Sequence, residues 1–253
     1  MTPISVVIIT FNEEQNISRC LASVMGLADE IVVLDSFSSD GTQEICENYG
    51  VNFYQHKFDG HIEQKNRAIG YAKYPHVLSL DADEVLSDEL KKSILEIKNN
   101  WSRDGFYFNR LTNYCGQWVR HCGWYPDQKL RLWDSRKGAW GGNNPHDEFI
   151  LQSGCTQQHI KGDLLHYSYH SITEHVKQAD NFTNITAQNA YSRGKRSSVF
   201  KVWTLPKWKF FRDYILKRGF LDGYYGYVIC KISANATFLK YVKLLQLQKN
   251  KTL

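Results

Sequence analysis

The chain has 253 residues, of which 42% are hydrophobic and 23% are charged, and its formal net charge is +5. This composition is that of a folded globular protein and excludes a disordered chain, while the length predicts one core with a C-terminal appendage. The apolar run at residues 5–9 is too short for a signal sequence or a membrane span, so we expect a cytoplasmic protein.

The six cysteines are scattered along the chain without a Cys-x-x-Cys pair. This spacing argues against a zinc knuckle and against the disulfide framework of small secreted domains. We expect reduced thiols that serve the packing of the fold.

The first 85 residues alternate predicted strands with predicted helices. Strands are predicted from short apolar, β-branched runs and helices from apolar side chains three or four residues apart. The predicted strands are residues 4–10, 30–35, 51–55 and 76–80, and the predicted helices are residues 13–24, 41–48 and 62–72. Because the strands are almost continuously apolar, we expect a doubly wound α/β unit, a largely parallel sheet with helices on both faces.

Polar loops follow three of these strands, at the carboxyl ends where ligands bind in sheets of this kind. Each loop carries carboxylates; the residues are Thr10, Asn12 and Glu13, then Asp35, Ser38, Ser39 and Asp40, then Asp81, Asp83 and Glu84. The chain has no Gly-x-Gly-x-x-Gly segment after the first strand and no Gly-Lys-Ser/Thr loop, which removes the main support for a dinucleotide site or a P-loop.

One apolar strand runs directly into two carboxylates, Asp81 and Asp83. A hard divalent cation commonly binds one or two carboxylates together with phosphate oxygens, so this strand end predicts a metal beside a diphosphate. The alternative is that these acids cap a helix that starts near Ser87. Asp35 can accept hydrogen bonds from a base or a ribose, and Lys65 faces either the anionic part of a nucleotide or solvent.

The chain after residue 86 is less regular. Helices are predicted at residues 87–100 and 173–192. Residues 106–149 are rich in Tyr, Trp, Arg and Gly, which predicts irregular strands and loops that close over the cleft.

The last part of the chain is basic and aromatic. Residues 199–217 interleave aromatic side chains with Lys and Arg, and residues 193–253 contain only two acids. This composition suits the headgroup layer of an anionic membrane, on which the segment would lie because it is too charged to span. An amphipathic helix packed on the α/β domain is the alternative.

Four segments stand in an order and spacing that resemble family 2 glycosyltransferases of the GT-A fold. They are Thr10-Phe-Asn-Glu13, Val33-Leu-Asp-Ser-Phe-Ser-Ser-Asp-Gly-Thr42, Gln64-Lys-Asn66 and Asp81-Ala-Asp-Glu84. Further segments are similar to the branch that builds lipopolysaccharide core, as in β-1,4-glucosyltransferases that act on the inner-core heptose. These are Gly123-Trp-Tyr-Pro-Asp127, Leu130-Arg-Leu132, Pro145-His-Asp-Glu148, His166-Tyr-Ser-Tyr169 and Gly219-Phe-Leu-Asp-Gly223.

The resemblance implies a role for each matching position. Asp83 is expected to bind Mg²⁺ or Mn²⁺, Asp81 the ribose or the metal, and His166 the metal unless it is a partly buried structural histidine. Arg131 is expected to pair with the diphosphate or an anionic acceptor, unless it forms a surface salt bridge. The residues implied in donor binding are Thr10, Asn12, Glu13, Asp35, Lys65, Asp81 and Arg131.

Inverting transfer needs a carboxylate that takes the proton from the acceptor hydroxyl. The two candidates are Asp147 and Glu148. The branch usually shows His-Glu where this chain has His146-Asp147, so the register leaves both open, and we favour Asp147.

The resemblance thus implies an inverting glycosyltransferase that moves a hexose, with glucose from UDP-glucose as first candidate, to lipopolysaccharide core or another cell-surface glycan. Residues 1–100 would bind the nucleotide-sugar, 101–192 would complete the same catalytic domain on the acceptor side, and 193–253 would form the basic aromatic region. A glycolipid acceptor at the inner face of the cytoplasmic membrane favours a membrane surface, and no nucleic acid, as the partner of that region. A nucleotidyltransferase and a non-catalytic binding protein acting through the basic tail are the alternatives.

Overall fold

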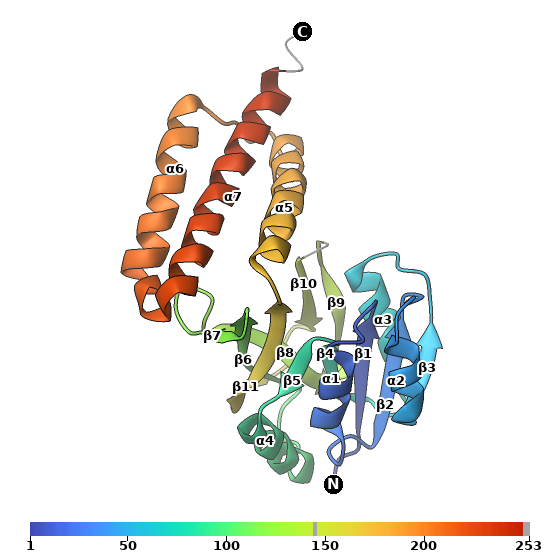
Figure 1. Ribbon diagram of the computed structural model, residues 1–253. Coiled ribbons are helices and arrows are strands. Elements are labelled where there is room, and N and C mark those ends of the chain that lie inside the picture. The colour runs from blue at the N-terminus through green and yellow to red at the C-terminus, as the bar shows by residue number, and fades with distance from the viewer. Residues whose placement is uncertain (144–145, 250–253) are drawn as a thin grey trace. The chain divides into compact units, whose positions relative to one another are not determined.

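The structure is a computed structural model that describes residues 1–143 and 146–249 (Figure 1). The chain folds into two compact units. The sheet unit comprises Met1–Arg110 and Asp127–Tyr167, and the helical unit comprises Leu111–Pro126 and Ser168–Leu253. The division into three segments that the sequence suggests stays a prediction.

The first half of the sheet unit alternates parallel strands with helices, as predicted. Strand β1 pairs with β2 and with β4, and β2 pairs with β3, so that β3-β2-β1-β4 is a parallel run. The elements are β1 (Ile4–Thr10), α1 (Ile17–Val24), β2 (Glu30–Asp35), α2 (Thr42–Asn48), β3 (Asn52–Gln55), α3 (His61–Gly70) and β4 (His76–Asp81). The apolar, β-branched runs of the sequence therefore form the buried strands.

Antiparallel strands extend this sheet beyond β4 in the order β4-β8-β6-β11-β5, and β7 pairs with β6. The elements are β5 (Glu84–Leu86), α4 (Asp88–Asn99), β6 (Gly105–Tyr114), β7 (Gln117–Val119), β8 (Asp127–Asp134), η1 (Ser135–Lys137) and β11 (Gln157–Tyr169). Strands β9 (Gly138–Asn143) and β10 (His146–Leu151) form a separate two-stranded hairpin. Pro145 of the predicted acidic motif lies outside the described residues.

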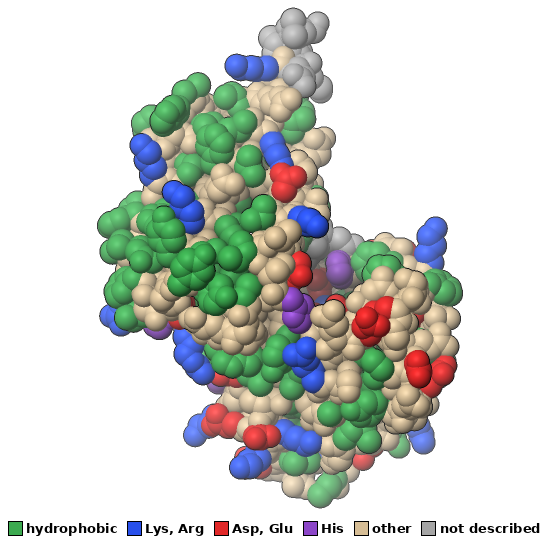
Figure 2. Space-filling view, viewed as in Figure 1, with side chains coloured by type: hydrophobic (Ala, Val, Ile, Leu, Met, Phe, Trp, Pro, Cys, Tyr) green, Lys and Arg blue, Asp and Glu red, His purple; other side chains and the backbone are tan. Residues whose placement is uncertain are grey.

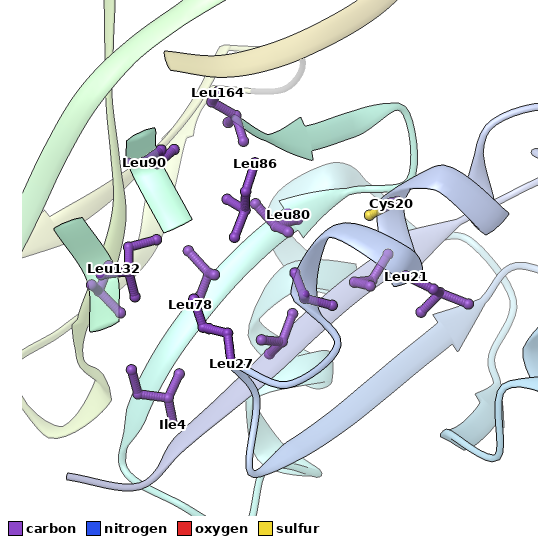
Figure 3. Packing of buried hydrophobic residues seen from close by; sticks show 14 of the residues in the cluster. Ile4, Cys20, Leu21, Leu27, Leu78, Leu80, Leu86, Leu90, Leu132 and Leu164 are labelled. Atoms are coloured by element: carbon purple, nitrogen blue, oxygen red, sulfur yellow. The ribbon is translucent and has the colours of Figure 1, made fainter. Parts of the chain in front are cut away.

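Alternation of side chains along the strands divides the core of the sheet unit into two layers. Ile4, Val6 and Ile8 of β1 pack with apolar side chains of α1, α2 and α4. Figure 3 shows part of this cluster, including Ile4, Leu21 of α1 and Leu90 of α4. Val7, between them in sequence, faces the other way and packs with Ala68 of α3 and with the hairpin. Helices therefore cover both faces of the sheet, which is the predicted doubly wound arrangement.

The helical unit is built around three helices, with α7 between α5 and α6 (Figure 1). Its elements are α5 (Ile172–Ser192), α6 (Val199–Phe211), the π-helical η2 (Arg212–Leu216), η3 (Gly219–Asp222) and α7 (Gly223–Lys249). Helix α5 begins with a capping box in which Ser171 Oγ accepts from the backbone N–H of Glu174, and the Glu174 side chain accepts from that of Ser171. Among the described residues, no helix is long and apolar enough to cross a membrane.

A cluster of aromatic side chains packs around His175, near the N-terminus of α5. The hydroxyl of Tyr114 lies 3.0 Å from Nδ1 of His175, and the rings of Trp124 and Tyr169 pack against the same imidazole. Burial in this setting lowers the pKa of His175 to about 4, because a charged imidazole would lose its hydration. His175 is therefore a neutral core residue at physiological pH.

Candidate active site

Asp81, the last residue of β4, is held by two cations from different elements. Lys65 of α3 places Nζ 3.0 Å from Asp81 Oδ1, and Arg131 of β8 places Nη2 2.9 Å from Asp81 Oδ2. Arg131 lies in β8 directly beside the paired stretch, whose last pair is Leu132 opposite Leu78 of β4. Desolvation alone would raise the pKa of Asp81, but Lys65 and Arg131 hold it well below its usual range.

Glu84 forms the second carboxylate of this cluster and is fully buried. Its side chain accepts hydrogen bonds from the backbone N–H of Asp81 at 3.0 Å and from Arg131 Nη2 at 3.0 Å, and Arg110 Nη1 lies 3.4 Å away. Burial would lower the pKa of Arg131, but Glu84 and Asp81 raise it, so the guanidinium stays charged. Charge buried in this way persists only when it is paired.

Asp147 approaches the cluster from the β9–β10 hairpin. Its Oδ2 lies 2.7 Å from Lys65 Nζ, so one buried lysine joins Asp147 to Asp81. Trp140 of the same hairpin packs against both cations. The centroid of its ring lies 4.5 Å from Lys65 Nζ and 5.4 Å from Arg131 Cζ, so the ring stabilises both positive charges. The side chain of Asn66 fixes Trp140 in turn, with one hydrogen bond to its carbonyl and one from its N–H.

Asp83 and His166 form a second pair. The short strand β5 lies antiparallel to β11, with Glu84 opposite His166, and this register places His166 beside Asp83 although they are far apart in sequence. Asp83 Oδ2 is 3.1 Å from His166 Nε2, while Nδ1 of the same imidazole is buried without a hydrogen-bond partner.

The geometry of this pair fits a divalent cation. Two ligands at neighbouring corners of an octahedron with metal bonds of ~2.1 Å lie ~3 Å apart, which is the separation of Asp83 Oδ2 and His166 Nε2. Within the described residues, no group of three or more His, Cys, Asp or Glu side chains could hold an ion. The two residues could therefore supply only part of a coordination shell, and phosphate oxygens or water would have to supply the rest.

The loop after β1 carries the first group of predicted donor-binding residues. Thr10 is buried and its hydroxyl has no hydrogen-bond partner, while Asn12 adopts a left-handed conformation and accepts a hydrogen bond from Ser39 N–H at 2.8 Å. Burial raises the pKa of Glu13, with an offset from Asn16 and a further rise from nearby carboxylates that include Asp83. Burial is thus the main cause of this rise, and the carboxylates that follow β4 add to it.

Asp35, at the end of β2, is fully buried. Its carboxylate accepts hydrogen bonds from the backbone N–H and the hydroxyl of Ser38, and from Gln55 Nε2 at 3.2 Å. These bonds fix the turn that follows β2. The polar loops after β1, β2 and β4 thus meet at one edge of the sheet, as the parallel order requires.

A cleft of about 1,210 Å³ opens beside the ion-pair cluster. Lys65, Asp81, Arg131, Asp147 and Glu148 all line it, together with Trp140 and with Arg110 and Lys129 from the neighbouring strands. Glu148, the neighbour of Asp147 on β10, has an exposed side chain. Predicted site residues from α3, β4, β8 and β10 therefore converge on one space. The other predicted site residues do not line it; they are Thr10, Asn12, Glu13, Asp35, Asp83 and His166.

The capping alternative for the acidic motif is wrong. Helix α4 begins with Ser87 as its N-cap, whose own hydroxyl accepts from Leu90 N–H at 3.2 Å. Asp81 and Glu84 are instead engaged by Arg131, and Asp83 by His166. The surface alternatives for Lys65 and Arg131 are wrong as well, because both side chains are buried.

Comparison with known proteins now decides the family. Residues 5–152 match glycosyl transferase family 2. The chain belongs to this family. It is accordingly a glycosyltransferase, and the resemblance seen in the sequence motifs is confirmed.

Relatives of the chain in this family span nearly its whole length. An uncharacterised glycosyltransferase of Rickettsia bellii is 30% identical over 254 residues, which cover 96% of this chain and 86% of the relative. The lipopolysaccharide core biosynthesis glycosyltransferase LpsC of Rhizobium meliloti is 26% identical over 255 residues, which cover 96% of this chain and 92% of LpsC.

The fold is similar to that of a solved glycosyltransferase structure. The mannosyltransferase of Pyrobaculum calidifontis, in complex with GDP-Man and Mn²⁺, has a TM-score of 0.59 and 14% sequence identity, over 97% of this chain and 88% of that one. The predicted GT-A fold is thereby confirmed. The individual roles of the site residues in this family 2 glycosyltransferase stay predictions.

Sequence reasoning gave no role to four residues that hold the site together. They are Asn66, Glu84, Arg110 and Trp140. Glu84 had a signal, since it follows Asp83 directly and a third acid at a strand end needs partners. Trp140 lies in a glycine-rich stretch with no periodicity. Its contact with Lys65 and Arg131 depends on the pairing of β9 with β10, which the sequence does not reveal.

Proposed function

We propose that this family 2 glycosyltransferase is an inverting, metal-assisted hexosyltransferase that acts on a lipopolysaccharide core or another cell-surface glycan. The observation that carries the proposal is the chain of contacts Asp81–Lys65–Asp147 along one wall of the cleft. It joins the end of a nucleotide-binding sheet to a carboxylate on a separate hairpin, so that donor and acceptor functions meet across a single lysine.

Asp83 and His166 are the residues proposed to hold Mg²⁺ or Mn²⁺. When bound, such an ion would neutralise the charge that develops on the leaving nucleoside diphosphate. Lys65 and Arg131 line the cleft and can bind phosphate oxygens, with Arg131 suited to two parallel hydrogen bonds. The buried setting strengthens these charge interactions relative to water.

The loop after β1 is proposed to hold the nucleotide. Thr10 offers a buried hydroxyl without a partner, and Asn12 and Glu13 follow it directly. Asp35 is proposed to read the base or ribose through the turn that it fixes with Ser38. Asp81 would contact the ribose, because its two carboxylate oxygens are already oriented by Lys65 and Arg131.

Asp147 is proposed as the base. It would accept the proton of the acceptor hydroxyl as that oxygen attacks the anomeric carbon, and Lys65 at 2.7 Å holds the carboxylate in place. Glu148 lines the same cleft, but its side chain is exposed. No salt bridge joins Glu148 to another described residue, whereas Asp147 is paired with Lys65. A fixed, partly buried carboxylate is the better base, since less reorganisation precedes proton transfer.

The donor and acceptor are proposed on different grounds. UDP-glucose follows from the resemblance of the sequence to lipopolysaccharide core glucosyltransferases, while the Pyrobaculum neighbour binds GDP-Man. A lipopolysaccharide core acceptor is supported by the similarity to LpsC over nearly the full chain. Family membership favours glycosyl transfer over nucleotidyl transfer.

The test is an assay of nucleoside diphosphate release. The purified protein would be incubated with UDP-glucose, UDP-GlcNAc or GDP-mannose, with Mn²⁺, Mg²⁺ or EDTA, and with core oligosaccharide as acceptor. We expect release from one donor, dependent on both the metal and the acceptor. Release of pyrophosphate in place of the diphosphate would support the nucleotidyltransferase alternative.

Two variants connect this assay to the site. Asp83→Asn removes a charged metal ligand, and we expect it to weaken activation by Mn²⁺ by at least tenfold. Asp88→Asn is the matched control, since Asp88 is an exposed acid in the first turn of α4. Unchanged Mn²⁺ activation in Asp83→Asn would falsify the assignment of the metal to this pair.

A further inference from the structure

One face of α6 is exposed and aromatic. Phe200, Trp203, Lys207 and Phe211 recur at intervals of three or four residues, which places them on one side of the helix. Phe200 is 75% exposed and Trp203 is 66% exposed, and Trp208 flanks this stripe with its ring near that of Phe211. The opposite side of α6, which carries Val202 and Leu205, is half-buried.

The exposed apolar surface continues beyond the end of α6. It takes in Ile215 and Leu216 of η2, Phe220 and Leu221 of η3, and Tyr224 and Tyr227 of α7, all of them exposed. We call this surface, together with Phe200, Trp203, Trp208 and Phe211, the aromatic face. Hydrophobic side chains gather over this part of the helical unit in Figure 2.

The aromatic face rests on a firm base. The ring of Tyr214 is stacked on that of Phe210 and contacts the rings of Phe220 and Tyr227. Phe210 and Tyr214 pack in turn against the buried cluster around Ile229. The exposed side chains therefore belong to ordered helices whose other side is packed, and they are not parts of a loop.

The charges around this face are of one sign. Residues 193–249 contain 13 Lys and Arg and only two acids, Asp213 and Asp222. Both acids are buried and satisfied inside the unit, Asp213 by Lys209 and Arg212, and Asp222 by His121. No carboxylate of this segment is left to neutralise the cations at the surface.

Several of those cations border the aromatic face directly. Lys207 lies on the stripe itself, with Nζ 5.7 Å from the ring of Trp203. Lys217 and Arg218 follow Leu216 and are exposed, and within the described residues no salt bridge engages them or Lys207. Aromatic rings, aliphatic side chains and unneutralised cations thus occupy the same surface.

This combination identifies the partner. Aromatic rings and Lys or Arg beside an apolar surface suit the headgroup layer of an anionic bilayer, where rings enter the interface and cations meet phosphates. A second copy of the chain would bring two strongly positive surfaces together, which opposes association. Single-stranded nucleic acid would use the rings for stacking, but would leave Ile215, Leu216 and Leu221 without a role.

We propose that the aromatic face docks the helical unit on the surface of a membrane rich in anionic lipid. Trp203, Trp208 and Phe211 enter the interface, and Lys207, Lys217 and Arg218 contact lipid phosphates. The proposal stands independently of the transfer reaction, because it rests on the helical unit alone.

The experiment is cosedimentation of the full-length protein with vesicles. One vesicle preparation contains phosphatidylcholine alone and the other an equimolar mixture of phosphatidylcholine and phosphatidylglycerol. We expect binding to the anionic vesicles, a blue shift of tryptophan fluorescence on binding, and weaker binding at high salt. Equal binding to both vesicles, or none to either, would overturn the proposal.

Two double variants divide the apolar and electrostatic contributions. Trp203→Ala with Trp208→Ala should weaken vesicle binding roughly tenfold for each indole removed from the interface. Lys207→Gln with Arg218→Gln should weaken it roughly fivefold for each cation and reduce its salt dependence. The matched control is Val176→Ala with Ile185→Ala, which removes exposed apolar side chains from α5 of the same unit.

Folding controls accompany these variants. Circular dichroism and thermal melting of each variant should match the parent protein, and the salt dependence and fluorescence shift of the unmodified protein test the proposal without any substitution.

Two further measurements would assign the face to another partner. Light scattering that reports a dimer abolished by the Trp203→Ala, Trp208→Ala variant, without vesicle binding, would assign the face to a second copy. Binding of an oligothymidylate probe without vesicle binding would assign it to nucleic acid.

Discussion

The two units of the molecule carry opposite charge and use it differently. The sheet unit has a formal charge of −7 and the helical unit one of +12, which together give the net +5 of the chain. In the sheet unit, Asp81, Glu84 and Asp147 are engaged by Lys65 and Arg131 within one cluster. In the helical unit Asp213 and Asp222 are buried, Glu174 and Asp180 are exposed, and the cations outnumber these acids.

The difference between the two units shows two uses of charge that the net charge of the whole chain does not reveal. Paired charges in a low-dielectric setting fix the positions of a few side chains, which is what a site for chemistry needs. Unpaired charges at a surface attract a partner from a distance and are weakened by salt. Substitutions in the two units should therefore have effects of different kind and size.

The largest expected effect is on turnover in the sheet unit. Asp147→Asn should lower kcat by roughly 10²–10⁴, the usual contribution of a general base, while Glu148→Gln should change it by less than about tenfold. Both are isosteric replacements, measured by diphosphate release with the acceptor present. A larger loss in Glu148→Gln than in Asp147→Asn would transfer the role of base to Glu148.

The next effect is on stability and tests whether the buried cluster behaves as paired charge. Arg131→Met should lower the free energy of unfolding by about 3–5 kcal/mol, because the buried Glu84 loses its closest cation. Urea unfolding measures the change. Arg67→Met, which removes the partner of the exposed Asp59, is the control and should have little effect. Similar losses in the two variants would contradict the contrast between buried and surface pairs.

A smaller effect concerns the core of the helical unit and depends on pH. The folded-state pKa of His175, about 4, lies below its ordinary value of 6.5, so between these values the unfolded chain binds a proton that the folded chain does not. Stability should therefore fall as the pH drops through 6.5, by about 3 kcal/mol at pH ~4.

His175→Gln should remove this part of the pH dependence while retaining a hydrogen-bonding group for Tyr114. Thermal melting at pH 7 and pH 4.5 measures it. His159→Gln, a change of an exposed histidine, should keep the slope of the parent protein. An unchanged slope in His175→Gln would show that this imidazole is protonated in the folded state.

The smallest effect is expected at a surface pair of the helical unit. Lys243 of α7 donates hydrogen bonds to Asp180 at 2.6 Å and to the hydroxyl of Thr183 at 2.8 Å on α5. Asp180 is largely exposed, so Lys243→Met should cost less than about 1 kcal/mol of stability. Urea unfolding that shows a loss as large as that of Arg131→Met would remove the distinction between the two units.

Much of the sheet unit could be predicted from sequence because its information is local. The strands up to β4 are short β-branched runs, and the carboxylates that follow them must meet at one edge of a parallel sheet. The family was recognisable for the same reason, since Asp35, Asp81 and Asp83 stand at the ends of those strands. The largest error in these bounds is the start of α1, predicted at residue 13 and found at Ile17, and the other bounds differ by at most two residues.

Helices α4 and α5 also agree with the predicted helices at residues 87–100 and 173–192. The strands after β4 could not be placed from sequence, because their positions depend on pairing between distant segments. Strand β5 has only three residues, and its position follows from its partner β11. Helix α7 intersperses polar residues such as Lys231, Asn235 and Lys240 among apolar ones, so its 27 residues show no clear helical period. The contact of Lys65 with Asp147 joins residues 82 positions apart and requires the hairpin to fold over α3.

The pairing of β5 with β11 has a consequence for the folding of the chain. His166 faces Asp83 only while these two strands are in register, so a cation that needs both ligands has affinity for the native state and little for the unfolded one. Occupancy would then slow exchange of the amide protons of Val85 and Leu165 with solvent. The pairing of β5 with β11 would therefore open least often when the cation is bound.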